Sequence, residues 1–130
     1  MLKESPEIQP NKERIALWVQ ALRSNQYTKI RAKLRNTENG RCCLGVACDV
    51  SQISNWNWVQ LDEKSCPTYD GCGTDWQYMP PNVAKWFGFN NNNPSVIING
   101  HLEKLSIIND TTSCSLSDIA DLIETTYLNG

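Results

Sequence analysis

Apolar residues recur at helical spacing near the start of the chain. They follow the i, i+3, i+4, i+7 pattern of one helix face: Ile15, Trp18, Val19 and Leu22. Asn11, a residue type that favours N-caps, stands just before them. The pattern predicts an amphipathic helix over residues 12–23 with one buried stripe.

Three more helices are expected in the second half of the chain. Residues 79–88 carry proline near the start and Gly88 at the end, which is the usual asymmetry of a short helix. Residues 101–109 place Leu102, Leu105 and Ile108 at helical spacing. In the last helix, Ser115 is the N-cap and Asp118 stands three residues later, as in a capping box.

The most apolar ten-residue window runs from Arg41 to Val50 and contains three cysteines. Small residues within it, such as Gly45 and Ala47, allow close packing against neighbouring elements. We interpret residues 42–53 as a buried central helix. A buried strand stays open as the alternative, because a short apolar run does not distinguish the two.

Weaker signals predict the remaining elements. Residues 95–98 are apolar and β-branched, as in a short strand, and residues 57–61 alternate weakly, with residues 74–78 as a possible partner. Residues 26–35 are expected to form a short helix or an extended crossing, followed by a turn at 37–40. The prediction is a helix-rich α+β fold with a small antiparallel β element, in which an N-terminal arm (1–10) precedes one globular domain (11–130).

Charge and hydropathy limit the partners of this domain. The chain has 130 residues and a formal net charge of −2, so it lacks the clustered positive charge that drives nucleic-acid binding. No apolar stretch reaches the length of a membrane span, and residues 1–10 contain no apolar signal-peptide core. We expect no membrane association and no nucleic-acid partner.

Four blocks of the sequence resemble a family of small uncharacterised proteins from tailed phages, cyanophages included. The most specific block is Cys42-Cys43-Leu44-Gly45-Val46-Ala47-Cys48-Asp49; the others are residues 18–24 with Tyr27, residues 80–88, and residues 105–124. The resemblance implies a virus-encoded protein that acts in the cytoplasm of a bacterial host during infection. It implies no reaction, so no catalytic residue is carried over.

The cysteines suggest the one enzymatic hypothesis. Cys42 or Cys43 at a helix start could have a lowered thiol pKa and act as a nucleophile, with His101 as base. The competing interpretation is that three thiols in one apolar window fill the core. No Cys-x-x-Cys pair accompanies the six cysteines, so neither a metal nor a cofactor is predicted.

The binding hypothesis rests on an aromatic segment and a basic run. The aromatic residues stand among Asn, Asp, Gly and Pro in a stretch of little periodicity: Trp56, Trp58, Tyr69, Trp76 and Tyr78. Trp and Tyr in long loops are common where partners bind, and Arg31 and Arg35 of the basic run could add charge. We predict a non-catalytic protein that binds a host or defence component, either a protein or a small nucleotide-like ligand. The alternative is a cysteine-dependent hydrolase or transferase.

Overall fold

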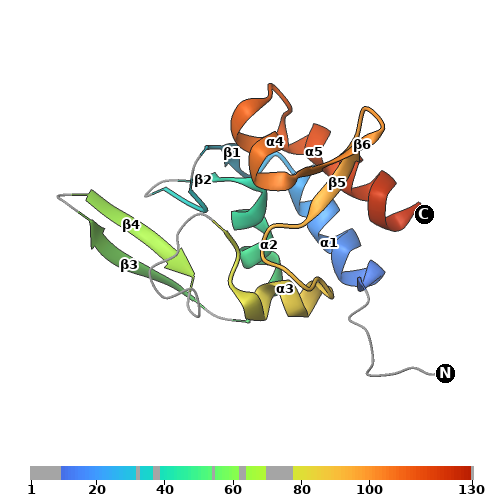
Figure 1. Ribbon diagram of the computed structural model, residues 1–130. Helices are drawn as coiled ribbons and strands as arrows, with labels where there is room; N and C mark the ends of the chain where they lie inside the picture. Colours follow the sequence, from blue (N-terminus) through green and yellow to red (C-terminus); the bar gives the residue numbers. More distant parts are fainter. Residues whose placement is uncertain are drawn as a thin grey trace.

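The computed structural model shows a helical body with short strand pairs at its edges (Figure 1). It describes residues 10–31, 33–36, 39–53, 55–61, 64–69 and 78–129. The helices in these residues are α1 (Lys12–Leu22), α2 (Cys43–Ser51), α3 (Pro81–Phe87), α4 (Leu105–Thr111) and α5 (Leu116–Ile123), and a π-helical turn, η1 (Glu124–Leu128), continues α5. The predicted helix-rich α+β fold is confirmed.

The strands of the described residues form separate pairs rather than one sheet. β1 (Thr28–Lys29) and β2 (Gly40–Arg41) run parallel; β3 (Trp56–Leu61) pairs with β4 (Lys64–Tyr69), and β5 (Ser95–Ile98) with β6 (His101–Lys104), both antiparallel. Figure 1 shows the β3–β4 hairpin to one side of the helices, while the β5–β6 hairpin lies near α4 and α5. The helices therefore form the core, and the strand pairs lie at its edges.

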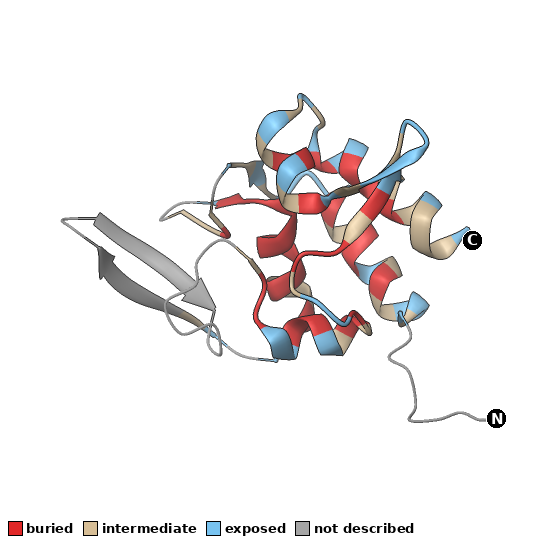
Figure 2. Ribbon diagram, viewed as in Figure 1, coloured by how far each residue is buried: buried red, intermediate tan, exposed pale blue. Residues whose placement is uncertain are grey.

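The core is centred on α2, which is buried along nearly its whole length (Figure 2). Trp18 of α1 is fully buried and its indole N–H donates a 3.0 Å hydrogen bond to the Cys43 carbonyl. The Trp18 ring also packs against Phe87, with the ring centroids 5.2 Å apart. The predicted buried helix is thus confirmed over Cys43–Ser51, and the strand alternative is wrong.

Capping residues explain several helix boundaries. The Asn11 side chain accepts a hydrogen bond from the Arg14 N–H at the start of α1. Ser115 and Asp118 form the predicted capping box of α5, each side chain bonding to the other residue's backbone N–H. The α2 helix ends where Gln52 adopts a left-handed conformation with a φ of 53°.

Position 45 shows how closely α2 packs against the chain that precedes it. A Cβ atom built on Gly45 would lie 1.9 Å from the carbonyl oxygen of Leu34. The same carbonyl accepts a 3.2 Å hydrogen bond from the Cys42 N–H. Since a backbone oxygen cannot turn away as a side chain can, this contact requires glycine.

The helix predicted over residues 101–109 is wrong in its first four residues. His101–Lys104 forms β6, and α4 begins only at Leu105. The cause is a two-residue turn, in which Asn99 and Gly100 have φ angles of 53° and 84°. An Asn-Gly pair adopts these angles readily and reverses the chain into a hairpin, and that overrides the helical spacing of the leucines.

Three other expectations need correction or lie outside the described residues. Residues 26–35 contain no helix in their described part; they form the short strand β1 and an extended crossing, the second of the two alternatives. β3 pairs with Lys64–Tyr69, which the sequence did not suggest, and residues 74–77 of the expected partner lie outside the described residues. Residues 1–9 of the predicted arm and residues 37–38 of the predicted turn are likewise outside them.

The described residues contain no helix that is long and apolar enough to span a membrane.

The Gly45 contact can be tested by replacing the glycine with alanine. We expect Gly45→Ala to lower the free energy of unfolding by about 3 kcal/mol, at the upper end for overpacking, because backbone must move. Gly100→Ala is the matched control: its Cβ meets nothing within 4 Å, so only the strain of its 84° φ remains, about 1 kcal/mol. Chemical denaturation measures both, and equal losses would contradict the close contact.

Candidate functional site

The two adjacent cysteines lie at the N-terminal end of α2, as the nucleophile hypothesis expected. Cys42 is the N-cap, and its sulfur accepts a hydrogen bond from the Gly45 N–H at 3.4 Å. Cys43 occupies the first helical position, and its thiol donates to the carbonyl of Leu105 at 3.8 Å. Both contacts are with backbone groups inside the core.

The environment of these thiols suppresses ionisation. Burial raises the pKa of Cys42 to about 12 and raises the pKa of Cys43 well above its ordinary value, in each case against the smaller effect of nearby backbone N–H groups. The negative charge of Asp110 raises both pKa values further. Because the thiolate is the nucleophilic form, the two residues have the opposite of the pKa shift that activation requires.

His101, the proposed base, lies in the exposed strand β6. The hydrogen bonds of the two thiols go to Gly45 and Leu105 instead of to an imidazole. The described residues also hold no group of three or more His, Cys, Asp or Glu placed to bind a metal ion. The geometry gives the cysteine hydrolase alternative no support.

Asn109 in α4 secures the start of α2. The residue is 1% exposed, and its side-chain carbonyl oxygen accepts a hydrogen bond from the Cys43 N–H at 3.1 Å. Its amide group donates to the Ile30 carbonyl at 2.8 Å and to the Asp110 carboxylate at 2.9 Å. This one buried amide therefore joins α2, α4 and the segment after β1.

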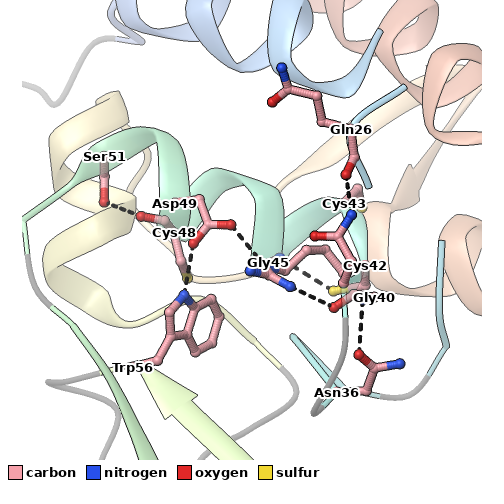
Figure 3. A network of polar contacts seen from close by, with 12 residues as sticks. Gln26, Asn36, Gly40, Cys42, Cys43, Gly45, Cys48, Asp49, Ser51 and Trp56 are labelled. Atoms are coloured by element: carbon pink, nitrogen blue, oxygen red, sulfur yellow. Dashed lines mark hydrogen bonds and ion pairs between the residues drawn. The ribbon is translucent and has the colours of Figure 1, made fainter. Parts of the chain in front are cut away.

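A polar and aromatic group lies along α2, near the base of the β3–β4 hairpin; Figure 3 shows two of its members, Asp49 and Trp56. We call it the Asp49 cluster: Tyr27, Arg35, Arg41, Asp49 and Trp56. The Asp49 carboxylate accepts from the Arg41 Nε at 2.9 Å and from the Trp56 indole N–H at 2.7 Å. One carboxylate thus fixes both the strand before α2 and the first residue of β3.

Guanidinium groups cover the aromatic rings of this cluster. Arg35 lies over the Trp56 ring at 5.3 Å from its centroid, and Arg41 lies near both the Trp56 ring at 5.7 Å and the Tyr27 ring at 5.4 Å. Burial lowers the pKa of Arg35, and the neighbouring charge of Arg41 lowers it further. The Tyr27 pKa is raised by burial and then by the charge of Asp49. The cluster is a packed assembly in which cation–π contacts accompany the ion pair.

The basic run separates into two roles. Arg35 belongs to the Asp49 cluster, whereas Arg31 donates to the Thr112 carbonyl at 3.2 Å. Lys29 donates to the Cys114 carbonyl at 2.5 Å. Arg31 and Lys29 therefore hold the connection between α4 and α5, which is a structural role that the run's charge pattern did not reveal.

Tyr78, the last residue of the aromatic segment, lines a separate cavity of about 220 Å³. The other lining residues come from α4 and from the chain around α2: Lys33, Cys42, Ser106, Ile107, Asn109, Asp110 and Thr111. Lys33 and Asp110 give its wall one charge of each sign. Of the two members of the aromatic segment whose side chains the structure describes, Tyr78 lines this cavity and Trp56 belongs to the Asp49 cluster.

The remaining predicted residues are placed by backbone alone or lie outside the described residues. In the register of the hairpin, Tyr69 pairs with Trp56, and Trp58 pairs with Pro67. Trp76 is outside the described residues. Tyr69 and Trp56 therefore end the same hairpin side by side, at its junction with α2.

Sequence reasoning missed Arg41, Asp49, Tyr27 and Asn109 as members of these networks. Arg41 and Asp49 are the two charged residues of the apolar window, and the apolar pattern did not indicate that they pair. In the sequence, Asn109 is the last residue of a predicted helix, where a polar side chain is expected to be exposed. Its burial could not be predicted because it depends on α2 packing against α4. Acidic and amide residues next to an apolar helix were the available signal.

Residues 11–127 match the model of a family described as a domain of unknown function, DUF8296. The chain belongs to this family. No curated protein and no solved structure matches the sequence. The match includes α1 to α5 in full, so the thiol-bearing helix and the Asp49 cluster both lie within the DUF8296 domain.

The ion pair of the Asp49 cluster predicts a stability effect. In Asp49→Asn, the Arg41 guanidinium keeps its buried position, with 9% of its side chain exposed, but loses its counter-charge. We expect the free energy of unfolding to fall by roughly 2–3 kcal/mol, measured by chemical denaturation. The control is Asp121→Asn, which removes an exposed partner of Arg23 and should cost less than about 1 kcal/mol. Equal effects would show that the cluster does not act as a buried pair.

The raised thiol pKa values predict slow alkylation. With iodoacetamide at neutral pH, Cys42 and Cys43 in the folded protein should react at least about tenfold more slowly than Cys114, because they are buried and protonated. Peptide-resolved mass spectrometry measures each rate, and the rates should converge in denaturant. Fast labelling of Cys42 or Cys43 in the folded protein would contradict this prediction and support the nucleophile hypothesis.

Proposed function

We propose that this DUF8296 protein is a phage-encoded accessory protein that binds a host or defence component in the bacterial cytoplasm and catalyses no reaction. The observation that carries the proposal is the contact between Arg35 and the Trp56 ring, at 5.3 Å. It joins the basic run to the aromatic segment at the point where the β3–β4 hairpin meets α2. The basic run and the aromatic segment, which separately suggested binding, are thus adjacent in space at Arg35 and Trp56.

Trp56 anchors the base of the β3–β4 hairpin. Its ring is covered by guanidinium groups, and its indole N–H is already bonded to Asp49. A residue satisfied in this way holds the hairpin in a fixed position relative to α2. Partner contact then falls to the aromatic residues that follow it, Trp58, Tyr69 and Trp76. A rigid base supports binding because fewer degrees of freedom are lost on association.

A protein is the better-supported class of partner. The cavity that contains Tyr78 measures about 220 Å³, below the roughly 300–1,000 Å³ typical of small-molecule sites. The Trp56 ring, which a nucleotide base would need for stacking, is already in contact with Arg35 and Arg41. Aromatic and arginine side chains are enriched at the centres of protein interfaces.

The phage context rests on the sequence blocks that resemble tailed-phage proteins, above all the run from Cys42 to Asp49. In the structure this run forms α2 and its cap, the centre of the core. A sequence that specifies the core is a marker of the fold. The resemblance to tailed-phage proteins therefore supports the proposed place of action, and the contact between Arg35 and Trp56 supports the proposed binding.

The proposal is tested by capture from infected cells. Tagged protein is incubated with lysate of bacteria infected by a tailed phage, and the bound proteins and small molecules are identified by mass spectrometry. We expect one host or phage-defence protein to be retained by wild type and retained at least about tenfold less by Trp58→Ala or Trp76→Ala, as for interface hot spots.

The matched control is Trp86→Ala, which removes a tryptophan of α3 that contacts Arg14 at 4.4 Å, outside the proposed surface. This variant should retain the partner, and circular dichroism should show folded protein in every case. Unchanged capture by folded Trp58→Ala and Trp76→Ala would refute the role of these tryptophans in binding. Specific retention of a nucleotide instead of a protein would refute the choice of partner.

A further inference from the structure

The β5–β6 hairpin carries a pair of exposed apolar side chains on its outer face. Ile97 and Leu102 are directly opposite each other in the register and are 48% and 67% exposed. The neighbouring pair on the other face, Val96 and Glu103, turns Val96 into the core. The hairpin therefore has one face against the body and an apolar pair of side chains in solvent. Figure 2 shows most of β6 as exposed.

The turn determines which backbone groups of the hairpin point outward. With a two-residue turn at Asn99 and Gly100, the flanking residues Ile98 and His101 exchange the hydrogen bonds of the ladder. The next pair, Ile97 and Leu102, then directs its peptide groups away from the hairpin. In agreement, the Ile97 N–H donates to the Thr126 hydroxyl at 2.9 Å, on the outer edge of β5.

On the outer edge of β6, the same alternation directs the Leu102 N–H and C=O outward. The hydrogen bonds of the described residues include none to these two groups beyond the hairpin. The next outward amide, that of Lys104, donates to the Glu103 carboxylate at 3.0 Å. The edge therefore offers one residue's donor and acceptor rather than a continuous row.

A single available residue suits a two-fold partner better than a long peptide. An extended peptide gains affinity from several consecutive backbone hydrogen bonds. Two antiparallel strands related by a two-fold axis can instead meet at one residue, whose N–H and C=O bond to the same groups of its copy. Leu102 has the geometry for that arrangement.

We propose that the chain forms a homodimer in which β6 pairs with β6 of a second copy, with Leu102 on the two-fold axis. In this register, Ile97 and Leu102 of both copies form one apolar stripe across four strands. His101 stands opposite Glu103 of the second copy, which places complementary polar groups together. The proposal does not depend on the proposed function.

Other registers are less favourable. A two-fold axis at Glu103 would bring two carboxylates directly opposite each other and would place Leu102 against Lys104. A two-fold axis placed between two residues of β6 would put the apolar stripes of the two copies on opposite faces of the sheet. Charge and face alternation together select the register centred on Leu102. A contact this small lies below roughly 1,200 Å², so a weak dimer is expected.

Disulfide trapping tests the register. At the two-fold axis, the Cα atoms of residue 102 in the two copies lie about 5.5 Å apart, within disulfide range. Leu102→Cys should therefore form an intermolecular disulfide under mild oxidation, assigned by peptide mass spectrometry because the chain has six other cysteines. Ile97→Cys is the matched control: its copies are separated by three strand spacings, about 14 Å, and should not cross-link.

Sedimentation of the untrapped protein tests the association itself. At about 0.5 mM, a concentration suited to a small interface, wild type should show a dimer fraction that Leu102→Lys abolishes. Leu17→Lys, which changes an equally apolar residue of α1 that is 49% exposed, should leave it intact. A wild type that stays monomeric, or a Leu102→Cys variant that cross-links no faster than Ile97→Cys, would overturn the proposal.

Discussion

The arrangement of this domain depends on the close approach of α2 to the backbone at Leu34. Without a side chain at position 45, the helix start reaches the Leu34 carbonyl, which then accepts a hydrogen bond from the Cys42 N–H. The same approach brings Arg35 into an antiparallel bridge with Arg41. Both guanidinium groups consequently reach the Trp56 ring, so the Asp49 cluster is a result of how the core packs.

Hydrogen bonds of buried polar groups fix the position of α2 relative to the neighbouring helices. Asn109 bonds to the Cys43 N–H and to the Ile30 carbonyl, and the Trp18 indole bonds to the Cys43 carbonyl. Each of these buried groups has a partner, as the cost of leaving one unsatisfied demands. Apolar contacts alone would allow α2 to slide along its neighbours, whereas these bonds specify its position at its first turn.

The sequence predicted those parts of the fold that depend on local rules. The periodic apolar stripe located α1, and the Ser115 and Asp118 pair located the start of α5, because both are set within a few residues. The error at residues 101–104 arose where helical spacing competed with an Asn-Gly turn, which was also a local signal. The thiol-rich window was correctly interpreted as core because its residues are small and apolar.

The candidate site was less predictable because it is assembled from distant segments. Trp56 and Arg35 were named from composition, but their contact depends on the packing of α2 against Leu34. Asp49 links Arg41 to Trp56, but in the sequence it is one charged residue within an apolar window, and its partners cannot be inferred from that position. Tyr78 was grouped with the tryptophans by sequence proximity, but in the structure it lines a cavity together with residues of α4.

The sulfur atoms of Cys42, Cys43 and Cys48 are protected only by the packing around them. In the folded domain, oxidants have little access to these atoms. Cys43 and Cys48 are fully buried in close-packed surroundings, which leave no room for the added oxygen of a sulfenic acid. In a newly synthesised or unfolded chain the same atoms are exposed and can be oxidised to forms that no longer fit. We therefore expect this domain to fold more completely when its thiols stay reduced until the core has closed.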